Sequence, residues 1–177
     1  MKSSKIFAVM AGLLLVTAGI FVWFAPGGPK AAPDISVFTA DGEQVALSGL
    51  QGNPVLVTFW ATTCRTCVRE IPDLAELYRE LAPQGLKIIA IAMYYDPPDR
   101  VLAMRKARDI PYTIALDIRA DAARAFGNVR LTPTAFLVAP DGRIVYRKTG
   151  KLSFKRLRED ILSMLKQPAA HKPVQAG

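Results

Sequence analysis

Apolar positions follow two different spacings along the chain, and their order predicts strands that alternate with helices. Residues 55–60 and 86–92 are almost continuous apolar runs, typical of strands buried on both faces. Between them, from Cys67 to Leu81, apolar residues recur every three or four positions, which predicts a helix that Pro72 kinks. Because a helix joins the two strands, we expect them to pair in parallel.

Shorter patterns on either side complete the predicted sheet. Alternating apolar residues around an Asp-Gly turn predict a leading hairpin at 38–47, and a Pro-Asp-Gly sequence predicts a second hairpin between strands 135–138 and 144–146. The remaining predicted elements are a helix at 97–108, a strand at 113–116, a short helix at 120–126 and a last helix at 154–165. This order predicts an α/β sheet covered by helices on both faces.

The first 25 residues carry a different pattern. Lys2 and Lys5 precede 20 uncharged residues from Ile6 to Ala25, and about 20 apolar residues suffice for a helix to span a bilayer. We interpret residues 1–25 as an uncleaved transmembrane helix, with a cleaved signal peptide as the alternative. The lysines place the N-terminus in the cytoplasm, so we expect a single-pass protein of the cell inner (cytoplasmic) membrane whose domain faces the periplasm or extracytoplasmic side.

Composition divides the rest of the chain into three parts. Pro and Gly at 26–33 predict a linker, and residues 34–166 form the predicted folded domain. Residues 167–177, which are rich in Pro and Ala, are expected to form a disordered tail.

The chain is basic, with 23 Lys and Arg against 15 Asp and Glu and a net charge of +8 over 177 residues. Such a charge suggests nucleic acid or anionic lipid as a partner. An exported domain does not meet nucleic acid, so we expect none. We interpret the basic stretch from Arg143 to Arg158 as a solvated strand edge and helix face, with docking to anionic lipid or an acidic partner as the alternative.

Two cysteines and one histidine restrict the chemistry further. Two thiols are too few for a disulfide-stabilised scaffold or a four-ligand zinc site. His171 lies six residues from the C-terminus, which leaves no credible imidazole for Ser-His-Asp or Cys-His catalysis or for a multi-histidine metal site. We therefore expect neither a metal nor a cofactor.

The two cysteines form a Cys64-Arg65-Thr66-Cys67 sequence between a buried strand and a helix. Amide groups at a helix N-terminus stabilise a thiolate, so this is a reactive position. We expect Cys64 to be the more exposed nucleophile, which attacks the partner's disulfide, and Cys67 to be the resolving thiol, which then releases the partner from Cys64. A purely structural disulfide or a metal-binding pair are the alternatives, whereas covalent haem is excluded because Val68 stands where that motif needs histidine.

Residues 55–72 resemble the strand, active site and kinked helix of thioredoxin-fold proteins of the membrane-anchored TlpA/ResA type. Residues 125–134 are similar to that family's loop with a cis-proline opposite the disulfide, a role that would fall to Pro133. The resemblance covers residues 34–165 and implies a thioredoxin-like fold, a mixed central sheet flanked by helices. The leading hairpin and the central α-β insertion from Tyr94 to Leu116 are also similar to this branch.

The resemblance also bears on Glu70, Thr132 and Pro133, and the charge of Arg65 suggests a role for that residue. Glu70 stands where several members carry a glutamate implicated in the redox chemistry, although a glutamate in a helix's first turn is also favourable through the helix dipole. Thr132 and Pro133 would offer backbone groups to an extended substrate. Arg65 would lower a thiol pKa by its charge or meet an acidic partner, unless it is simply an exposed loop residue.

The chain departs from the family pattern at three places. Thr58 stands where thioredoxin has a buried acid, which leaves Glu70 as the leading proton acceptor. Thr63 replaces a common tryptophan, and Arg65-Thr66 replaces a Gly-Pro pair. Residues between the cysteines tune the redox potential, so the direction of electron transfer stays open.

The function that we expect is that of a tethered protein-disulfide reductase acting on exported proteins. Its substrates would be of the cytochrome c maturation or copper-site assembly type, a membrane thiol transporter would re-reduce it, and it would act as a monomer. A disulfide-forming oxidase would use the same residues, whereas a peroxidase lacks support because Thr58 and Ala61 replace the Pro and Thr of that motif. The alternative of another class is a copper-binding assembly chaperone that holds Cu(I) on its thiolates.

Overall fold

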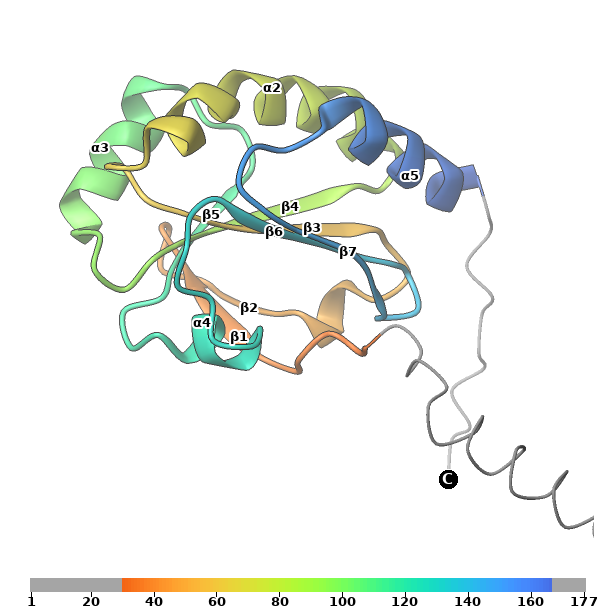
Figure 1. Cartoon of the computed structure of the whole chain (residues 1–177), viewed down its shortest axis with the longest axis horizontal. Helices are drawn as coiled ribbons and strands as arrows, with labels where there is room; N and C mark the ends of the chain where they lie inside the picture. Colours follow the sequence, from red (N-terminus) through yellow and green to blue (C-terminus); the bar gives the residue numbers. More distant parts are fainter. Residues whose placement is uncertain (1–29, 167–177) are drawn as a thin grey trace, which may run out of the picture.

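The computed structural model describes residues 30–166, which build a mixed β-sheet between two layers of helix (Figure 1). The predicted membrane anchor at 1–25, the start of the predicted linker and the predicted tail at 167–177 lie outside these residues. Within 30–166, no helix combines the length and the apolar character that crossing a membrane requires.

Strand β3 (Val55–Trp60) lies inside the sheet, and all six of its residues are buried. It pairs in parallel with β4 (Lys87–Ala92) and antiparallel with β6 (Thr134–Val138), which confirms the predicted parallel pair. On its far side β6 pairs with β7 (Ile144–Thr149) in the second predicted hairpin. A continuous apolar sequence suits β3 because helices cover both of its faces.

The sheet continues on the other side of β4 through the inserted strand. Strand β5 (Thr113–Leu116) pairs in parallel with β4 and antiparallel with β1 (Ser36–Thr39). Strand β2 (Gln44–Ala46) completes the leading hairpin, and the order across the sheet is β2-β1-β5-β4-β3-β6-β7. The leading hairpin and the central insertion are therefore confirmed, and the insertion places β5 between the hairpin and the central strands.

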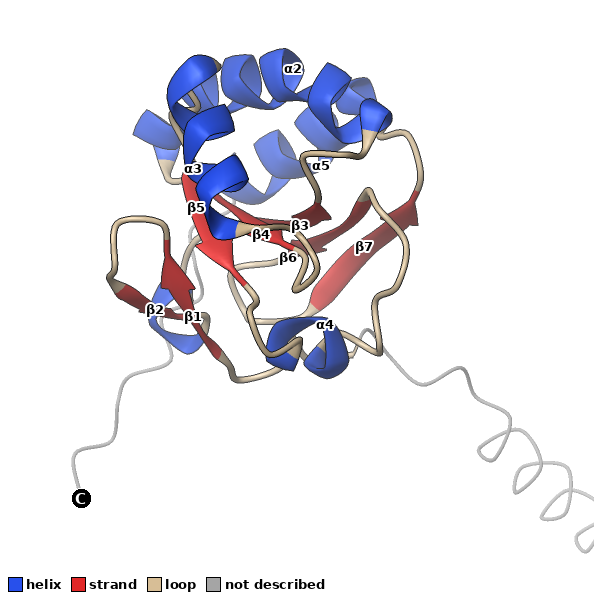
Figure 2. Ribbon diagram, turned by 90° about the vertical axis from the view of Figure 1, so that its left-hand side faces the viewer, coloured by secondary structure: helices blue, strands red, loops and turns tan. Residues whose placement is uncertain are grey.

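Three helices cover one face of the sheet and a short helix covers the other (Figures 1 and 2). The first group comprises α2 (Arg65–Leu81), α3 (Pro98–Ala107) and α5 (Phe154–Lys166), and α4 (Asp121–Ala125) lies opposite. Two 3-10 turns, η1 (Ser48–Leu50) and η2 (Ala82–Gln84), connect strands and helices. Helix α2 begins two residues earlier than predicted, because Cys64 rather than a residue near Cys67 caps it.

Each face of the sheet has its own hydrophobic core. Leu56 of β3 packs with Leu77 of α2 and Leu157 of α5 on one face, and all three are at most 1% exposed. On the other face the ring of Phe59 meets the rings of Phe126 and Phe136 at centroid distances of 5.5 and 6.1 Å. Strand β3 thus contributes side chains to both cores, which fixes its position.

The last residues of the predicted linker are hydrogen-bonded to the domain. Ala32 N donates to Gly142 O and Ile144 N donates to Lys30 O, each at 2.8 Å. Ala31 forms an isolated β-bridge with Arg143 between these two bonds. The edge strand's unpaired backbone groups offer this pairing, so the chain is held at the turn between β6 and β7 from residue 30 onward.

We expect Phe136→Ala to lower the free energy of unfolding by about 3–5 kcal/mol, because it removes a ring from the centre of the aromatic core. The measurement is urea unfolding of the disulfide form. Leu102→Ala on α3, where the side chain is 42% exposed, is the matched control and should change the free energy by about 0.5 kcal/mol or less. Equal effects of the two substitutions would contradict this core.

Candidate active site

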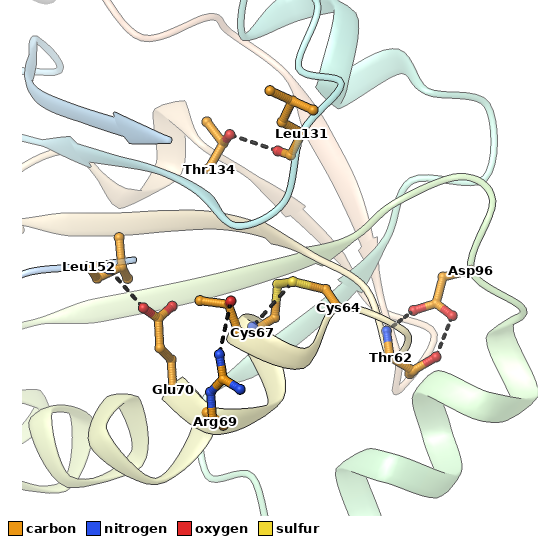
Figure 3. Close-up of a disulfide and its surroundings, with 10 residues drawn as sticks. Thr62, Cys64, Cys67, Arg69, Glu70, Asp96, Leu131, Thr134 and Leu152 are labelled. Atoms are coloured by element: carbon orange, nitrogen blue, oxygen red, sulfur yellow. Dashed lines mark hydrogen bonds between the residues drawn. A yellow bond between two sulfur atoms is a disulfide. The ribbon is translucent and has the colours of Figure 1, made fainter. Parts of the chain in front are cut away.

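The two cysteines form a disulfide at the N-terminus of α2, directly after β3 (Figure 3). Their Cα atoms are 5.3 Å apart, and Cys67 N donates to Cys64 Sγ at 3.2 Å. Cys67 is 4% exposed, whereas Cys64 is half-buried. The expected difference in exposure is confirmed, and it leaves Cys64 as the sulfur that a large partner can approach.

The loop before β6 contributes a proline beside the buried cysteine. The Thr132–Pro133 peptide bond is cis, as the resemblance implied, and Pro133 and Cys67 line the same cavity. Thr134 Oγ1 donates to Leu131 O at 2.7 Å and so closes the loop on itself. Figure 3 shows this loop, with Leu131, across from the disulfide. Thr132 is half-buried beside it.

Glu70 is buried in the second turn of α2, at 4% exposure. The alternative that it serves the helix dipole from the first turn is therefore wrong, because α2 begins at Arg65. Its Oε1 accepts a hydrogen bond from Leu152 N at 2.7 Å, which joins α2 to the segment before α5. The carboxylate thus sits inside the protein, one helical turn from Cys67.

Burial raises the pKa of Glu70 above its ordinary value of 4.5, because the charged form loses solvation. The hydrogen bond from Leu152 opposes this rise in pKa, and so do the charges of Lys151 and Arg69, while the charge of Asp73 adds to it. Desolvation is the largest of these effects. A carboxyl group tuned upward in this way can accept and return a proton closer to neutral pH than a surface glutamate can.

A second buried carboxylate, on Asp96, holds the other side of the disulfide. Its oxygens accept hydrogen bonds from Thr62 N and Thr62 Oγ1, both at 2.6 Å. Thr62 lies in the short segment between β3 and Cys64, so Asp96 ties this segment to the loop after β4. In Figure 3 the Asp96 contact and the Glu70 contact flank the disulfide from opposite sides.

The sequence patterns did not single out Asp96, Trp60 or Tyr112 as parts of the site. Asp96 precedes two prolines, and that pattern signals only the start of a helix. Trp60, Thr58 and Tyr112 join Cys67 and Glu70 around a cavity of about 10 Å³, close to the least volume that admits one water molecule. Trp60 Nε1 is buried there without a hydrogen-bond partner among the described residues, and burial raises the pKa of Tyr112.

Arg65, between the cysteines, is exposed and makes no ion pair with any residue in 30–166. It can therefore reach a bound partner. The basic stretch lies along β7, at one edge of the sheet, and along α5. Three of its arginines have carboxylate partners within the domain, in the pairs Arg143 with Asp141, Arg156 with Asp160 and Arg158 with Glu80.

Across the described part of the chain, no group of three or more His, Cys, Asp or Glu side chains is placed to hold a metal ion. The chain's one histidine, His171, lies outside that part. The thiolates of Cys64 and Cys67 remain the chain's soft ligands when reduced.

A Cys-x-x-Cys disulfide capping a helix, beside a cis-proline and next to the central strand of a mixed sheet, defines a thiol-disulfide oxidoreductase with a thioredoxin-like fold. The chain belongs to the Redoxin family, whose sequence pattern matches residues 27–161, and within it to the ResA type of thiol-disulfide oxidoreductase.

Two curated relatives and one solved structure illustrate this similarity. The thiol-disulfide oxidoreductase ResA of Halalkalibacterium halodurans is 31% identical over 129 residues, covering 73% of this chain and 72% of that protein. ResA of Bacillus subtilis is 27% identical over 176 residues, covering 94% and 97%. A thiol:disulfide interchange protein of the thioredoxin family from Chlorobium tepidum superposes with a TM-score of 0.72 at 27% identity, covering 80% of this chain and 99% of that one.

We expect Glu70→Gln to stabilise the disulfide form increasingly as the pH rises above about 4.5. Because the folded-state pKa of Glu70 is raised, the folded protein binds more protons than the unfolded chain between the ordinary and the raised value, so its stability falls as pH rises through that window. Glutamine can still accept the hydrogen bond from Leu152 but does not ionise. Urea unfolding from pH 4 to 8 measures the effect.

Glu76→Gln, an exposed position on the same helix, is the control for the charge change. It should follow the wild-type pH profile of stability. A uniform loss of stability in Glu70→Gln at every pH would show that the Leu152 hydrogen bond, rather than desolvation, dominates at this site.

Proposed function

We propose that this protein is an extracytoplasmic protein-disulfide reductase that acts on exported proteins, with Cys64 as nucleophile and Cys67 as resolving thiol. The observation that carries the proposal is the arrangement of the pair: a half-exposed sulfur at a helix N-terminus, and a buried sulfur one helical turn from a carboxyl group with a raised pKa. Both thiols are ready to exchange once reduced. A disulfide that closes so short a loop stabilises the fold little, which argues against a purely structural role.

In the first step, the Cys64 thiolate attacks one sulfur of the client disulfide. The client's S–S bond breaks, the displaced client sulfur leaves as a thiolate and takes up a proton, and Cys64 becomes joined to the client in a mixed disulfide. The partial positive charge at the N-terminus of α2 stabilises the attacking thiolate. The exposed guanidinium of Arg65 adds to this effect and can meet an anionic client.

In the second step, Cys67 loses its proton and attacks Cys64 Sγ. The mixed disulfide breaks, the second client sulfur leaves as a thiolate and is protonated, and the Cys64–Cys67 disulfide remains. Two electrons and two protons have then passed from the protein to the client. We assign Glu70 as the group that accepts the Cys67 proton, because Thr58 in the same cavity has no acidic proton to exchange.

The cis-proline loop is the surface on which the client chain lies in this proposal. Pro133 faces the cavity beside Cys67, and Thr132 is half-buried next to it. An extended client segment can pair with backbone groups here, as strands do along a sheet edge. That contact aligns the client disulfide with Cys64.

Continuous turnover needs a source of electrons, because each cycle leaves the disulfide form. We propose a membrane thiol transporter as the reductant and a cytoplasmic-membrane location for the protein, by way of the apolar segment 6–25. Cytochrome c maturation and copper-site assembly both require exported cysteines in reduced form. We propose clients of those two kinds. We also propose that the protein acts on them as a monomer.

The reduction potential of the Cys64/Cys67 couple tests the direction of transfer. We expect a value well below about −200 mV, on the side of thioredoxin rather than of strong oxidants near about −120 mV. Equilibration of the purified full chain with glutathione or dithiothreitol buffers, followed by thiol trapping, gives the potential. A value near that of the strong oxidants would replace the reductase by a disulfide-forming oxidase.

Cysteine variants test the assignment of the two sulfurs. Cys64→Ser should abolish reduction of a protein disulfide such as that of insulin, because the accessible nucleophile is lost. Cys67→Ser should accumulate a mixed disulfide with the substrate through Cys64, visible by non-reducing electrophoresis and mass spectrometry. Accumulation by the Cys64→Ser variant instead would reverse the two roles.

Glu70→Gln should slow the second step by about ten-fold or more, since general base catalysis contributes at least that much where a side chain moves the proton. The wild-type rate should fall as the pH drops below the raised pKa of Glu70, whose protonated form cannot accept a proton, and the variant should lack this inflection. Single-turnover decay of the mixed disulfide across pH measures both. Glu76→Gln should retain the wild-type rate and profile; an unchanged rate in Glu70→Gln would remove Glu70 from the mechanism.

A further inference from the structure

A groove lined by three arginines opens at the same end of the sheet as the disulfide. It has a volume of about 650 Å³, within the range of about 300–1,000 Å³ that ligand sites occupy. Arg119 follows β5, Arg124 lies on α4, and Arg130 lies between α4 and β6, three residues before Pro133. None of these arginines takes part in the two exchange steps described above.

Topology explains why the groove and the disulfide share one end of the sheet. Strands β3, β4 and β5 are parallel; Cys64 follows the first of them, and Tyr94 and Ile118 of the groove follow the other two. Pro133 is three residues from Arg130, and three residues of chain span at most about 11 Å. An extended client that passes Pro133 therefore comes to Arg130 within a few residues.

The groove carries a positive charge. Arg119 and Arg124 share one carboxylate, that of Asp121, at 2.8 and 2.5 Å. Arg130 has no ion pair within residues 30–166. The other nearby carboxylate, Asp117, is buried, and both of its oxygens accept backbone N–H groups of α4. Three guanidinium groups thus stand against two carboxylates, one of which faces inward.

Apolar side chains border the charged groups. Tyr94 and Ile118, which line the groove, are 56% and 69% exposed, and Leu131, the residue after Arg130, is 66% exposed. Single exposed apolar residues are ordinary, but a group of them beside arginines and an aromatic ring has the composition of a binding surface. The combination suits a polypeptide with acidic and apolar residues better than a small anion, which would leave the apolar border unused.

We propose that this groove binds an acidic segment of the client polypeptide next to the client's reacting cysteine. The inference rests on the proposed function, since it takes a client disulfide to meet Cys64, and it adds a substrate class: disulfide-bonded proteins with Asp or Glu about three to six residues from that cysteine. Attraction between exposed charges acts mainly on the association rate and weakens with salt. The groove therefore selects clients by how fast they dock.

The test uses peptides that differ only in charge. Each has one cysteine, blocked as a mixed disulfide with 2-mercaptoethanol, and two Glu, two Gln or two Lys at the fourth and fifth residues on one side of it; a second set carries them on the other side. Exchange with the reduced full chain is followed by quenching and mass spectrometry. In at least one set we expect the Glu peptide to react about three- to ten-fold faster than the Gln peptide at about 50 mM salt, with the ratio approaching one at about 0.5 M.

Matched variants locate the effect. Arg119→Gln with Arg130→Gln should bring the Glu-to-Gln ratio close to one, and Arg119→Glu with Arg130→Glu should favour the Lys peptide. Lys148→Gln with Lys155→Gln removes the same charge from the exposed residues of β7 and α5 and should keep the wild-type ratio. The Gln peptide should react at the same rate with every variant, which shows that the active site is intact.

Equal ratios for the groove and control variants would overturn the proposal, as would a ratio of one in the wild type at low salt in both peptide sets. The same peptides as free thiols are also reacted with the disulfide form of the protein. If exchange is efficient only in this direction but still prefers the Glu peptide through Arg119 and Arg130, the groove stands and the reductase assignment fails. The two proposals therefore fail separately.

Discussion

The complete burial of β3 is the constraint on which the rest of the structure depends. Six consecutive apolar or β-branched side chains alternate between two cores, and each fully buried large side chain contributes roughly 1.5–3 kcal/mol. The strand therefore has a single register, because a slip by one residue would exchange the two sets of side chains. The end of β3 fixes where α2 begins, and hence that Cys64 is half-buried and Cys67 is buried. The different exposure of the two cysteines therefore depends on how the side chains of β3 pack in the two cores.

Two buried carboxylates then divide the support of the disulfide between them. Asp96 accepts two short hydrogen bonds from Thr62, one from its backbone N–H and one from its hydroxyl, and so holds the segment before Cys64 in place. Glu70 accepts one hydrogen bond, from Leu152 N, and its burial leaves the charged form less well solvated. The same functional group thus serves as a clamp on one side of the cysteines and as a titrating group on the other. Environment, rather than residue type, separates the two roles.

Local patterns predicted most of the fold and the reacting pair. Strands β3 and β4, helix α5 and the Asp-Gly hairpin are encoded by spacing and turn residues within a few positions, and the Cys-x-x-Cys pair is visible at once. The contacts that complete the site join residues far apart: Asp96 reaches Thr62 across 34 positions, and Leu152 reaches Glu70 across 82. Only the assembled sheet brings such partners together. Only the family resemblance predicted the cis bond before Pro133, since most X-Pro bonds are trans.

The pairing of Ala31 with Arg143 places the start of the described chain at one end of the domain. Val138, just before that turn, pairs with Val55 at the start of β3, whereas Cys64 lies beyond its end. Six strand residues, about 20 Å, separate the two ends. The polypeptide enters the domain at one pole and the sulfurs emerge at the other, as Figure 1 shows for the strand ends. Residue 30 therefore lies at the end of the domain opposite the cysteines, which leaves the reactive end clear of the point where the described chain begins.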